Sequence, residues 1–342
     1  MSSETTLMRQ EILEIPDAVD RLLSNGATAV QTAADQARAA NPAFLMSVAR
    51  GSSDHACTFL KYASELVLRK PMASVGPSVK SVYGVDLLCK DALCLSVSQS
   101  GQSPDIVRMT EAVAASGAIT AAITNDPASP LAKAAGATLA LHAGPEISVA
   151  ATKTFVTSLV AGLWLIAEIA DDTALLTAIR ALPRHLANAT ACDWSEAAAA
   201  MTGRSAYTLG RGPSWAISNE AALKFKETCL IHAESYSSAE VLHGPVSIVE
   251  EGFPVIGFAA NDPGGASLAE VADALAEKGA AVFATTPHVT RAKTLPHVAT
   301  DHWLTDPIAA IASFYGMVEK VARARGINPD TPRHLKKVTE TV

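Results

Sequence analysis

Short apolar runs alternate along this chain with longer segments whose apolar residues recur at helical spacing. The run Ala92–Val97 lies between polar turn residues and predicts a buried strand. Segments Ile106–Ala115 and Leu268–Lys278 show the spacing of amphipathic helices. Strands that alternate with helices predict an α/β fold, in which a parallel sheet is covered by helices on both faces.

The second half of the chain repeats the layout of the first with an offset of 161 residues. Leu45–Gly51 aligns with Ala206–Gly212, Ala92–Val97 with Phe253–Phe258, and Ile119–Ile123 with Ala281–Thr285 once one residue is inserted. The repeat predicts two parallel sheets in two domains, residues 1–190 and 191–342. The alanine-rich stretch Ala187–Ala200 is the predicted passage between them.

The polar loop Ser98–Asp105, directly after the first central strand, is a candidate phosphate site. Ser103 fits a helix N-cap, Pro104 the first helical position, and Asp105 the positive end of the helix dipole. A strand, a hydroxyl-rich glycine turn and a helix start together present N–H and O–H donors to an anion. The loop has no lysine, which excludes the nucleotide-binding P-loop. An ordinary capped strand-to-helix turn is the alternative.

The corresponding loop of the second half, Ala259–Asp262, has lost the hydroxyl groups and gained an acid. We therefore expect one domain to bind an anion and the other to serve a different purpose. Two further polar turns of the first half, Arg50–His55 and Gly144–Lys153, also follow predicted strands. Loops at the carboxyl ends of parallel strands gather where ligands bind, although serine and threonine are also common capping residues.

A helical segment of the second half places an acid on an apolar face. At 100° per residue Ala216, Leu223 and Leu230 form one stripe, and Glu227 falls inside it. A carboxylate in that position is costly unless it is paired, and Lys224 is the natural partner. The pair is either a structural ion pair or a general base with its cation. His243, before a Gly-Pro break, is either structural or an acid–base group.

Composition and charge narrow the classes of function. The chain has 342 residues, 49% of them hydrophobic, with a net charge of -7, which gives no support for a nucleic-acid or anionic-membrane partner. Five scattered cysteines, an odd number, favour free thiols in a reducing cytoplasm and argue against a zinc site. The polar start lacks a signal-peptide core, and the apolar stretch Phe155–Ala170 predicts a buried helix and not a membrane span.

Four stretches of the chain resemble the sugar isomerase (SIS) family. They are SVSQSGQSPD, AGPEISVAATKTF, EAALKFKETCLIHAESYSSAEVLHGP and PRHLKKVTETV. Their order resembles that of the isomerase half of glutamine–fructose-6-phosphate amidotransferases. The resemblance implies two flavodoxin-like domains, a sugar-phosphate substrate, and a homodimer whose active site is shared between subunits.

The resemblance also implies roles for individual residues. The residues that would hold the sugar phosphate are Ser98, Gln99, Ser100 and Ser103, with Ser52 and Ser53 from the first turn, and those that would contact the sugar are Val149 and Thr152. Glu227 matches the acid/base that moves a proton between C1 and C2, and Lys224 its assisting lysine. His243 matches the ring-opening histidine, which relatives supply from the neighbouring subunit. Lys337 matches a lysine that forms a Schiff base with the open-chain ketose.

Departures from the amidotransferase pattern shape the expected activity. Ala151 stands where the amidotransferases usually carry serine, and Arg50 where they carry cysteine. The first domain begins with a short helical lead-in in place of the glutaminase domain, so we expect no glutamine cleavage. Such a free-standing module resembles the second type of glucosamine-6-phosphate deaminase.

The expected reaction converts glucosamine 6-phosphate and water to fructose 6-phosphate and ammonia. Proton transfer and breakdown of a carbinolamine need no metal or organic cofactor. An aldose–ketose isomerase or a deglycase is the nearest alternative, and a non-catalytic sugar-phosphate sensor is an alternative of another class. The sensor is disfavoured because no DNA-binding helix-turn-helix precedes the module and the four candidate catalytic residues are all present.

Overall fold

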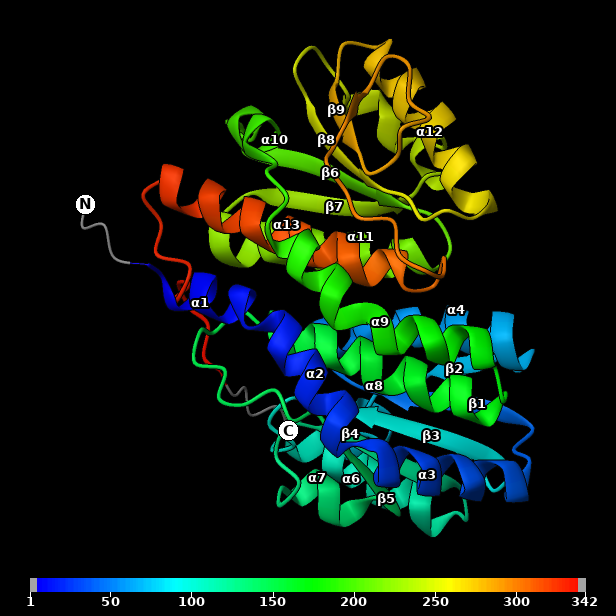
Figure 1. Ribbon diagram of the computed structural model, residues 1–342. Helices are drawn as coiled ribbons and strands as arrows, with labels where there is room; N and C mark the ends of the chain where they lie inside the picture. Colours follow the sequence, from blue (N-terminus) through cyan, green and yellow to red (C-terminus); the bar gives the residue numbers. More distant parts are fainter. Residues whose placement is uncertain (1–4, 338–342) are drawn as a thin grey trace. The chain divides into compact units, whose positions relative to one another are not determined.

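The computed structural model of the protein describes residues 5–337, which form two compact units (Figure 1). The first-sheet unit comprises residues 17–146, 153–180 and 336–337, and the second-sheet unit comprises residues 5–16, 147–152 and 181–335. The outermost parts of the predicted lead-in and tail, residues 1–4 and 338–342, lie outside the described residues.

The first-sheet unit contains a five-stranded parallel sheet in the order β2-β1-β3-β4-β5. Its strands are β1 (Phe44–Val48), β2 (Met72–Ser74), β3 (Ala92–Val97), β4 (Ile119–Thr124) and β5 (Ala137–Ala140). Its helices are α3 (Ala27–Ala40), α4 (Ser52–Ala63), α5 (Ser78–Ser81), α6 (Pro104–Ala115), α7 (Pro130–Ala134) and α8 (Lys153–Ile169), with a π-helical turn at Ser64–Leu68. Helices α3, α4 and α8 pack together as one group, and α5, α6 and α7 as another.

The second-sheet unit contains a five-stranded parallel sheet in the order β10-β9-β8-β6-β7. Its strands are β6 (Ser205–Gly210), β7 (His232–Ser237), β8 (Pro254–Phe258), β9 (Ala281–Ala284) and β10 (Lys293–Thr294). Its helices are α1 (Leu7–Leu13), α10 (Ser195–Ala200), α11 (Pro213–Cys229), α12 (Pro263–Ala276) and α13 (Asp306–Ala324), with 3-10 turns at Glu240–Leu242 and Pro245–Ile248. Two helices, α2 (Ile15–Asn25) and α9 (Thr173–Thr190), have residues in both units.

The predicted α/β architecture and the internal repeat are confirmed. Each sheet has the flavodoxin-like order, in which the first strand of the unit lies between the second and the third. The registers match as well, because Met46 pairs with Cys94 and Tyr207 pairs with Val255, each 161 residues later. The apolar helix predicted after the Gly144 turn is α8, whose side chains are buried from Lys153 to Ala167.

None of the helices within residues 5–337 is both long and apolar enough to cross a membrane. All five cysteines fall in the described part of the chain and are free thiols, as predicted.

The compact units divide the chain differently from the predicted domains 1–190 and 191–342. The unit boundary near the middle of the chain falls inside α9, between residues 180 and 181, and not in Ala187–Ala200. The lead-in helix α1 belongs with the second sheet because it packs against α13. Met8 and Ile12 are buried there, and Thr6, the N-cap of α1, donates its hydroxyl to the buried Glu319 at 2.9 Å.

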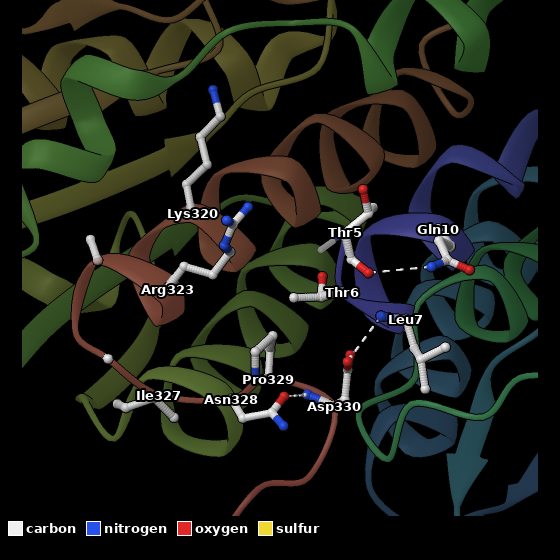
Figure 2. Close-up of a pocket in the computed structure, with 12 residues that line it drawn as sticks. Thr5, Thr6, Leu7, Gln10, Lys320, Arg323, Ile327, Asn328, Pro329 and Asp330 are labelled. Carbon is white, nitrogen blue, oxygen red and sulfur yellow. Dashed lines mark hydrogen bonds between the residues drawn. The ribbon is translucent and has the colours of Figure 1, made fainter. Parts of the chain in front are cut away.

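A carboxylate from the end of the chain fixes the start of α1. The backbone N–H groups of Leu7 and Met8 donate to Asp330 at 2.9 and 2.7 Å, as Figure 2 shows for Leu7. Because the first N–H groups of a helix lack partners within the helix, this carboxylate satisfies them and suits the positive end of the dipole. A cavity of about 920 Å³ lies beside this contact, between the start of α1, the last turns of α13 and the residues that follow α13.

The equivalent turns that follow β1 and β6 adopt one backbone conformation. Gly51 has φ 54° and ψ −132°, and Gly212 has φ 55° and ψ −132°. Residues with a Cβ rarely adopt this combination, so both turns depend on glycine.

We predict that Gly212→Ala lowers the free energy of unfolding of the second-sheet unit by about 1–3 kcal/mol. The added methyl group meets no heavy atom within 4 Å, so the loss reports backbone strain and not a clash. Urea unfolding of the intact protein measures it.

Gly203→Ala is the matched control in the same unit. Its backbone has no positive φ, and its added Cβ would come no nearer than 3.9 Å to a neighbour, so we expect a change within about 0.5 kcal/mol. Equal stability of the two variants would contradict the requirement for glycine at the turn.

Candidate active site

The hydroxyl-rich loop that follows β3 is held in place by its own residues and by the β4–α7 connection. Gly101 donates its N–H to the Ser98 hydroxyl at 3.2 Å, and the Gln99 carbonyl accepts from the N–H of Asn125 at 3.0 Å. Gly101 has φ 62° and lies so close to Ser129 that a Cβ would come within 2.2 Å of its hydroxyl oxygen. The loop is therefore preorganised before any ligand arrives.

The start of α6 agrees with its prediction. Ser103 is the N-cap and Pro104 the first residue of the helix, and the Ser103 side chain makes no capping hydrogen bond. Its half-buried hydroxyl group is thus not used by the helix. Asp105 lies in the first turn, as predicted, but it is buried and bound to Arg50, which the sequence did not indicate.

The turn Arg50–His55 and the loop Ser98–Asp105 lie side by side in the first-sheet unit. Strands β1 and β3 are hydrogen-bonded neighbours, so the turns at their carboxyl ends meet at one edge of the sheet. Arg50 links them by donating Nε–H and Nη2–H to Asp105 Oδ2 at 3.0 and 2.8 Å. Ser52 and Ser53, at the start of α4, are half-buried there. The predicted phosphate-binding residues are therefore brought together within this unit.

Lys337 binds a buried carboxylate of the first-sheet unit. Its Nζ donates to Glu146 Oε2 at 2.8 Å, and the same carboxylate accepts from the Thr154 N–H at 3.0 Å and hydroxyl at 2.6 Å. The Glu146 side chain has no exposed surface. Burial alone would raise the pKa of Glu146, but the Lys337 ammonium and the Thr154 hydrogen bonds lower it below its ordinary value of 4.5.

The predicted sugar-contacting residues belong to the other unit. Val149 donates its N–H to the Asp330 carbonyl at 3.3 Å, and Thr152 is fully buried. Glu11 of α1 accepts from the N–H of Ser148 at 3.3 Å, which fixes the same short segment, residues 147–152.

Helix α11 carries a buried lysine between two carboxylates. Lys224 forms an ion pair with Glu227, as predicted, and a second one with Glu220 at 3.3 Å. The side chains of Lys224 and Glu220 are 1% and 0% exposed, whereas that of Glu227 is 20% exposed. Glu227 is therefore the carboxylate of this cluster that a solute can reach.

The predicted stripe on α11 is wrong in detail. Leu230 is not on a buried face: it ends the helix in the left-handed conformation and is 42% exposed. The buried face is lined by Ala216, Ile217, Glu220, Ala221, Lys224, Phe225 and Thr228. The prediction of the stripe was wrong because α11 packs on both β6 and α13, so most of the helix surface is covered. The spacing of apolar residues alone then does not identify the buried face.

The charge on Lys224 is maintained by its neighbours. Burial opposes the ammonium form, but the carboxylates of Glu220 and Glu227 outweigh burial and raise the pKa of Lys224 above its ordinary value. Tyr315 Oη donates to Glu220 Oε1 at 3.3 Å, which adds a hydrogen bond to the buried acid. Lys224 thus acts as a fixed cation and not as a proton acceptor.

His243 stands apart from this cluster within the second-sheet unit. It follows the 3-10 turn Glu240–Leu242, its N–H donates to the Glu240 carbonyl at 2.9 Å, and its side chain is exposed. Among all the described residues, no group of His, Cys, Asp or Glu is placed to hold a metal ion.

Two acids, Glu220 and Glu146, and one ion pair, between Arg50 and Asp105, complete these arrangements and were not predicted from the sequence. Glu220 precedes Lys224 by four residues, the helical spacing and order that favour an ion pair, so this signal was present. Glu146 was part of a motif but not singled out, because its partner Lys337 lies 191 residues away. The Arg50–Asp105 pair likewise joins two loops through strand pairing that no local pattern encodes.

We predict that Lys224→Met lowers the free energy of unfolding by about 3–5 kcal/mol, because it leaves the Glu220 carboxylate buried without its cation. Urea unfolding at neutral pH measures the loss. The double variant Glu220→Gln with Lys224→Met should recover part of it.

Lys226→Met is the control, because Lys226 lies on the same helix but is exposed. We expect a change within about 0.5 kcal/mol. A loss in Lys224→Met no larger than in this control would refute the buried cluster.

We predict that the Glu146–Lys337 pair makes stability fall in acid. Because the pKa of Glu146 is lowered in the folded protein, its contribution is complete above 4.5 and is lost as the pH falls through the folded value. The difference in unfolding free energy between wild type and Glu146→Gln should therefore shrink from about pH 6 to about pH 3.5. A difference independent of pH over that range contradicts the ion pair.

The family model that matches this chain is the SIS domain, over residues 44–168 and 202–312. The glutamine–fructose-6-phosphate aminotransferase of Pyrobaculum aerophilum is 34% identical over 96% of this chain and 56% of its own length. The chain thus spans about half the length of the curated relatives that it matches.

Solved structures agree with this assignment. A protein of Silicibacter pomeroyi, described provisionally as a phosphosugar isomerase, is 61% identical with a TM-score of 0.93, over 95% of this chain and 100% of that one. Glucosamine-6-phosphate deaminase of Thermotoga maritima has the same fold, with a TM-score of 0.77 at 20% identity, over 98% of this chain and 100% of that one. The matched residues include most of both sheets, and the chain belongs to the SIS domain family.

Proposed function

We propose that the protein is an amino-sugar-phosphate deaminase that converts glucosamine 6-phosphate and water to fructose 6-phosphate and ammonia. The observation that carries the proposal is the α11 cluster, in which an accessible Glu227 is bound to a buried, permanently charged Lys224. A positioned carboxylate with a fixed counter-charge is suited to general acid–base catalysis.

In the proposed reaction the Ser98–Ser103 loop binds the phosphate group of the sugar. His243, from the neighbouring subunit of a homodimer, opens the sugar ring. Glu227 then removes the proton from C2 and returns it to C1, which turns the aldose amine into a ketose imine. Water adds to C2 of the imine, and the carbinolamine releases ammonia.

The exposures within the cluster support this division of roles. Glu220 has no exposed surface and cannot reach a substrate, so its role is to hold Lys224. Lys224 carries a charge that burial alone would disfavour, and it is therefore available to stabilise negative charge that develops next to Glu227.

An aldose–ketose isomerisation of a sugar phosphate is the second candidate. The likeness to the Silicibacter pomeroyi structure supports it. Both candidates use Glu227 in the same way, and only the deaminase releases an amine.

We predict that wild-type protein releases ammonia from glucosamine 6-phosphate and that Glu227→Gln lowers kcat by about 10²–10⁴-fold. The amide keeps the size of the side chain but cannot accept the proton from C2. Ammonia release in a coupled assay measures both proteins.

Lys226→Gln, one position earlier and exposed, is the control and should retain the wild-type rate. Full activity in Glu227→Gln would refute the mechanism. Formation of fructose 6-phosphate from glucose 6-phosphate, without ammonia from the amino sugar, would favour the isomerase.

A further inference from the structure

The Ser98–Asp105 loop contains a buried acid at the place where a phosphate group would bind. Asp105 is 1% exposed and lies in the first turn of α6, the helix whose N-terminus follows the loop. A phosphate group carries about two negative charges at neutral pH, so an uncompensated carboxylate in that turn would oppose its binding. The loop itself contains no lysine or arginine to offset the acid.

Arg50 provides the missing positive charge. It follows β1 and precedes the Gly51 turn into α4, directly beside the Ser98 loop at the end of β3. Its Nε–H and Nη2–H both donate to one oxygen of Asp105, at 3.0 and 2.8 Å, and these bonds fix one edge of the guanidinium group. The Arg50 side chain is nevertheless 49% exposed, so the ion pair is not closed off from solution.

The remaining donors of Arg50 are available to a ligand. A guanidinium group has five N–H donors in a planar fork, and only Nε–H and one Nη2–H are bound to Asp105. Planar recognition by paired N–H groups is the usual way in which arginine binds phosphate. An arginine whose one edge is fixed and whose other edge is exposed is thus already oriented for an anion.

We propose that Arg50 is a phosphate-binding residue of the first-sheet unit and that Asp105 is its positioning residue. The inference rests on the proposed function for the identity of the ligand, a sugar phosphate. Asp105 fixes the guanidinium group through one edge, and the other edge donates to the phosphate oxygens beside the Ser98 hydroxyl loop. The pair also removes the repulsion that Asp105 alone would exert.

The second half supplies an internal comparison. Arg211 occupies the equivalent position before Gly212, which has the same backbone conformation as Gly51. There, however, the N-terminus of α12 is capped by the carboxylate of Asp262, which accepts from the Gly265 N–H at 2.8 Å. An acid of the chain occupies the position that an anion would need, so Arg211 has no phosphate to bind.

Isothermal titration calorimetry of the intact protein with inorganic phosphate and with fructose 6-phosphate tests the proposal. Arg50→Met should raise both dissociation constants by about 10- to 100-fold, the loss expected for one charge-assisted hydrogen-bonded contact. Arg50→Lys, which keeps the charge but not the planar fork, should be intermediate. Arg211→Met is the matched control and should bind both ligands as wild type does.

A double variant separates direct contact from charge compensation. The Asp54 carboxylate also lies within electrostatic range of Arg50, so the loss of the guanidinium group changes the local charge as well as the contact. If Arg50 touches phosphate, Arg50→Met with Asp105→Asn stays at least tenfold weaker than wild type. Wild-type affinity in this double variant, or in Arg50→Met alone, overturns the proposal.

The readout does not depend on catalysis. Arginine-dependent phosphate binding without ammonia release would sink the deaminase proposal and leave this inference standing. Ammonia release by wild type, with phosphate affinity unchanged in Arg50→Met, would overturn this inference and leave the deaminase proposal standing. Circular dichroism tests whether each variant is folded. If Arg50→Met does not fold, Arg50→Lys is the variant that keeps the charge and still tests the planar contact.

Discussion

The proposed chemistry depends on keeping one ammonium group charged inside a helix–sheet interface. Taking a lysine out of water is unfavourable unless opposite charges surround it, and Glu220 and Glu227 supply them from adjacent turns of α11. Glu220 is fully buried, so its charge stabilises Lys224 and does not contact a ligand. Glu227 is covered on one side only, so the same interaction that stabilises the helix also presents an oriented carboxylate.

The first-sheet unit also contains buried acids, and other cations balance their charge. The side chain of Glu146, like that of Glu220, is fully buried, and it is balanced by Lys337 and two hydrogen bonds from Thr154. Asp105 is balanced by Arg50 in a loop that begins a helix. In each case a buried acid binds one cation. In the first-sheet unit the cation itself, Lys337 or Arg50, is partly exposed, and in the second-sheet unit the exposed group is Glu227, the second partner of Lys224. The units share a sheet topology and differ in where these charged pairs are placed.

Local sequence patterns predicted most of the fold but little of the charge pairing. Strand β3 and the start of α6 agree with the sequence residue by residue, because a continuous apolar run and capping chemistry act over a few neighbouring positions. The repeat and its one-residue insertion were also visible in the sequence. Periodicity could not place Leu230, because the end of α11 is set by a left-handed residue and by packing on two sides. The partners of Glu146 and Asp105 come from distant segments, so only the folded chain reveals them.

The assignment of α1 and Lys337 to units built mainly from other parts of the sequence has a consequence for biosynthesis. Neither unit is a continuous stretch of polypeptide, since the second-sheet unit draws on residues 5–16 and 147–152 as well as 181–335. A nascent chain emerging from the ribosome can form the first sheet early, but the acid Glu146 must wait for a lysine synthesised 191 residues later. The first N–H groups of α1 likewise lack their acceptor until Asp330 has been synthesised. Premature termination near the end of the message would therefore leave both units incomplete, although each would retain its whole sheet.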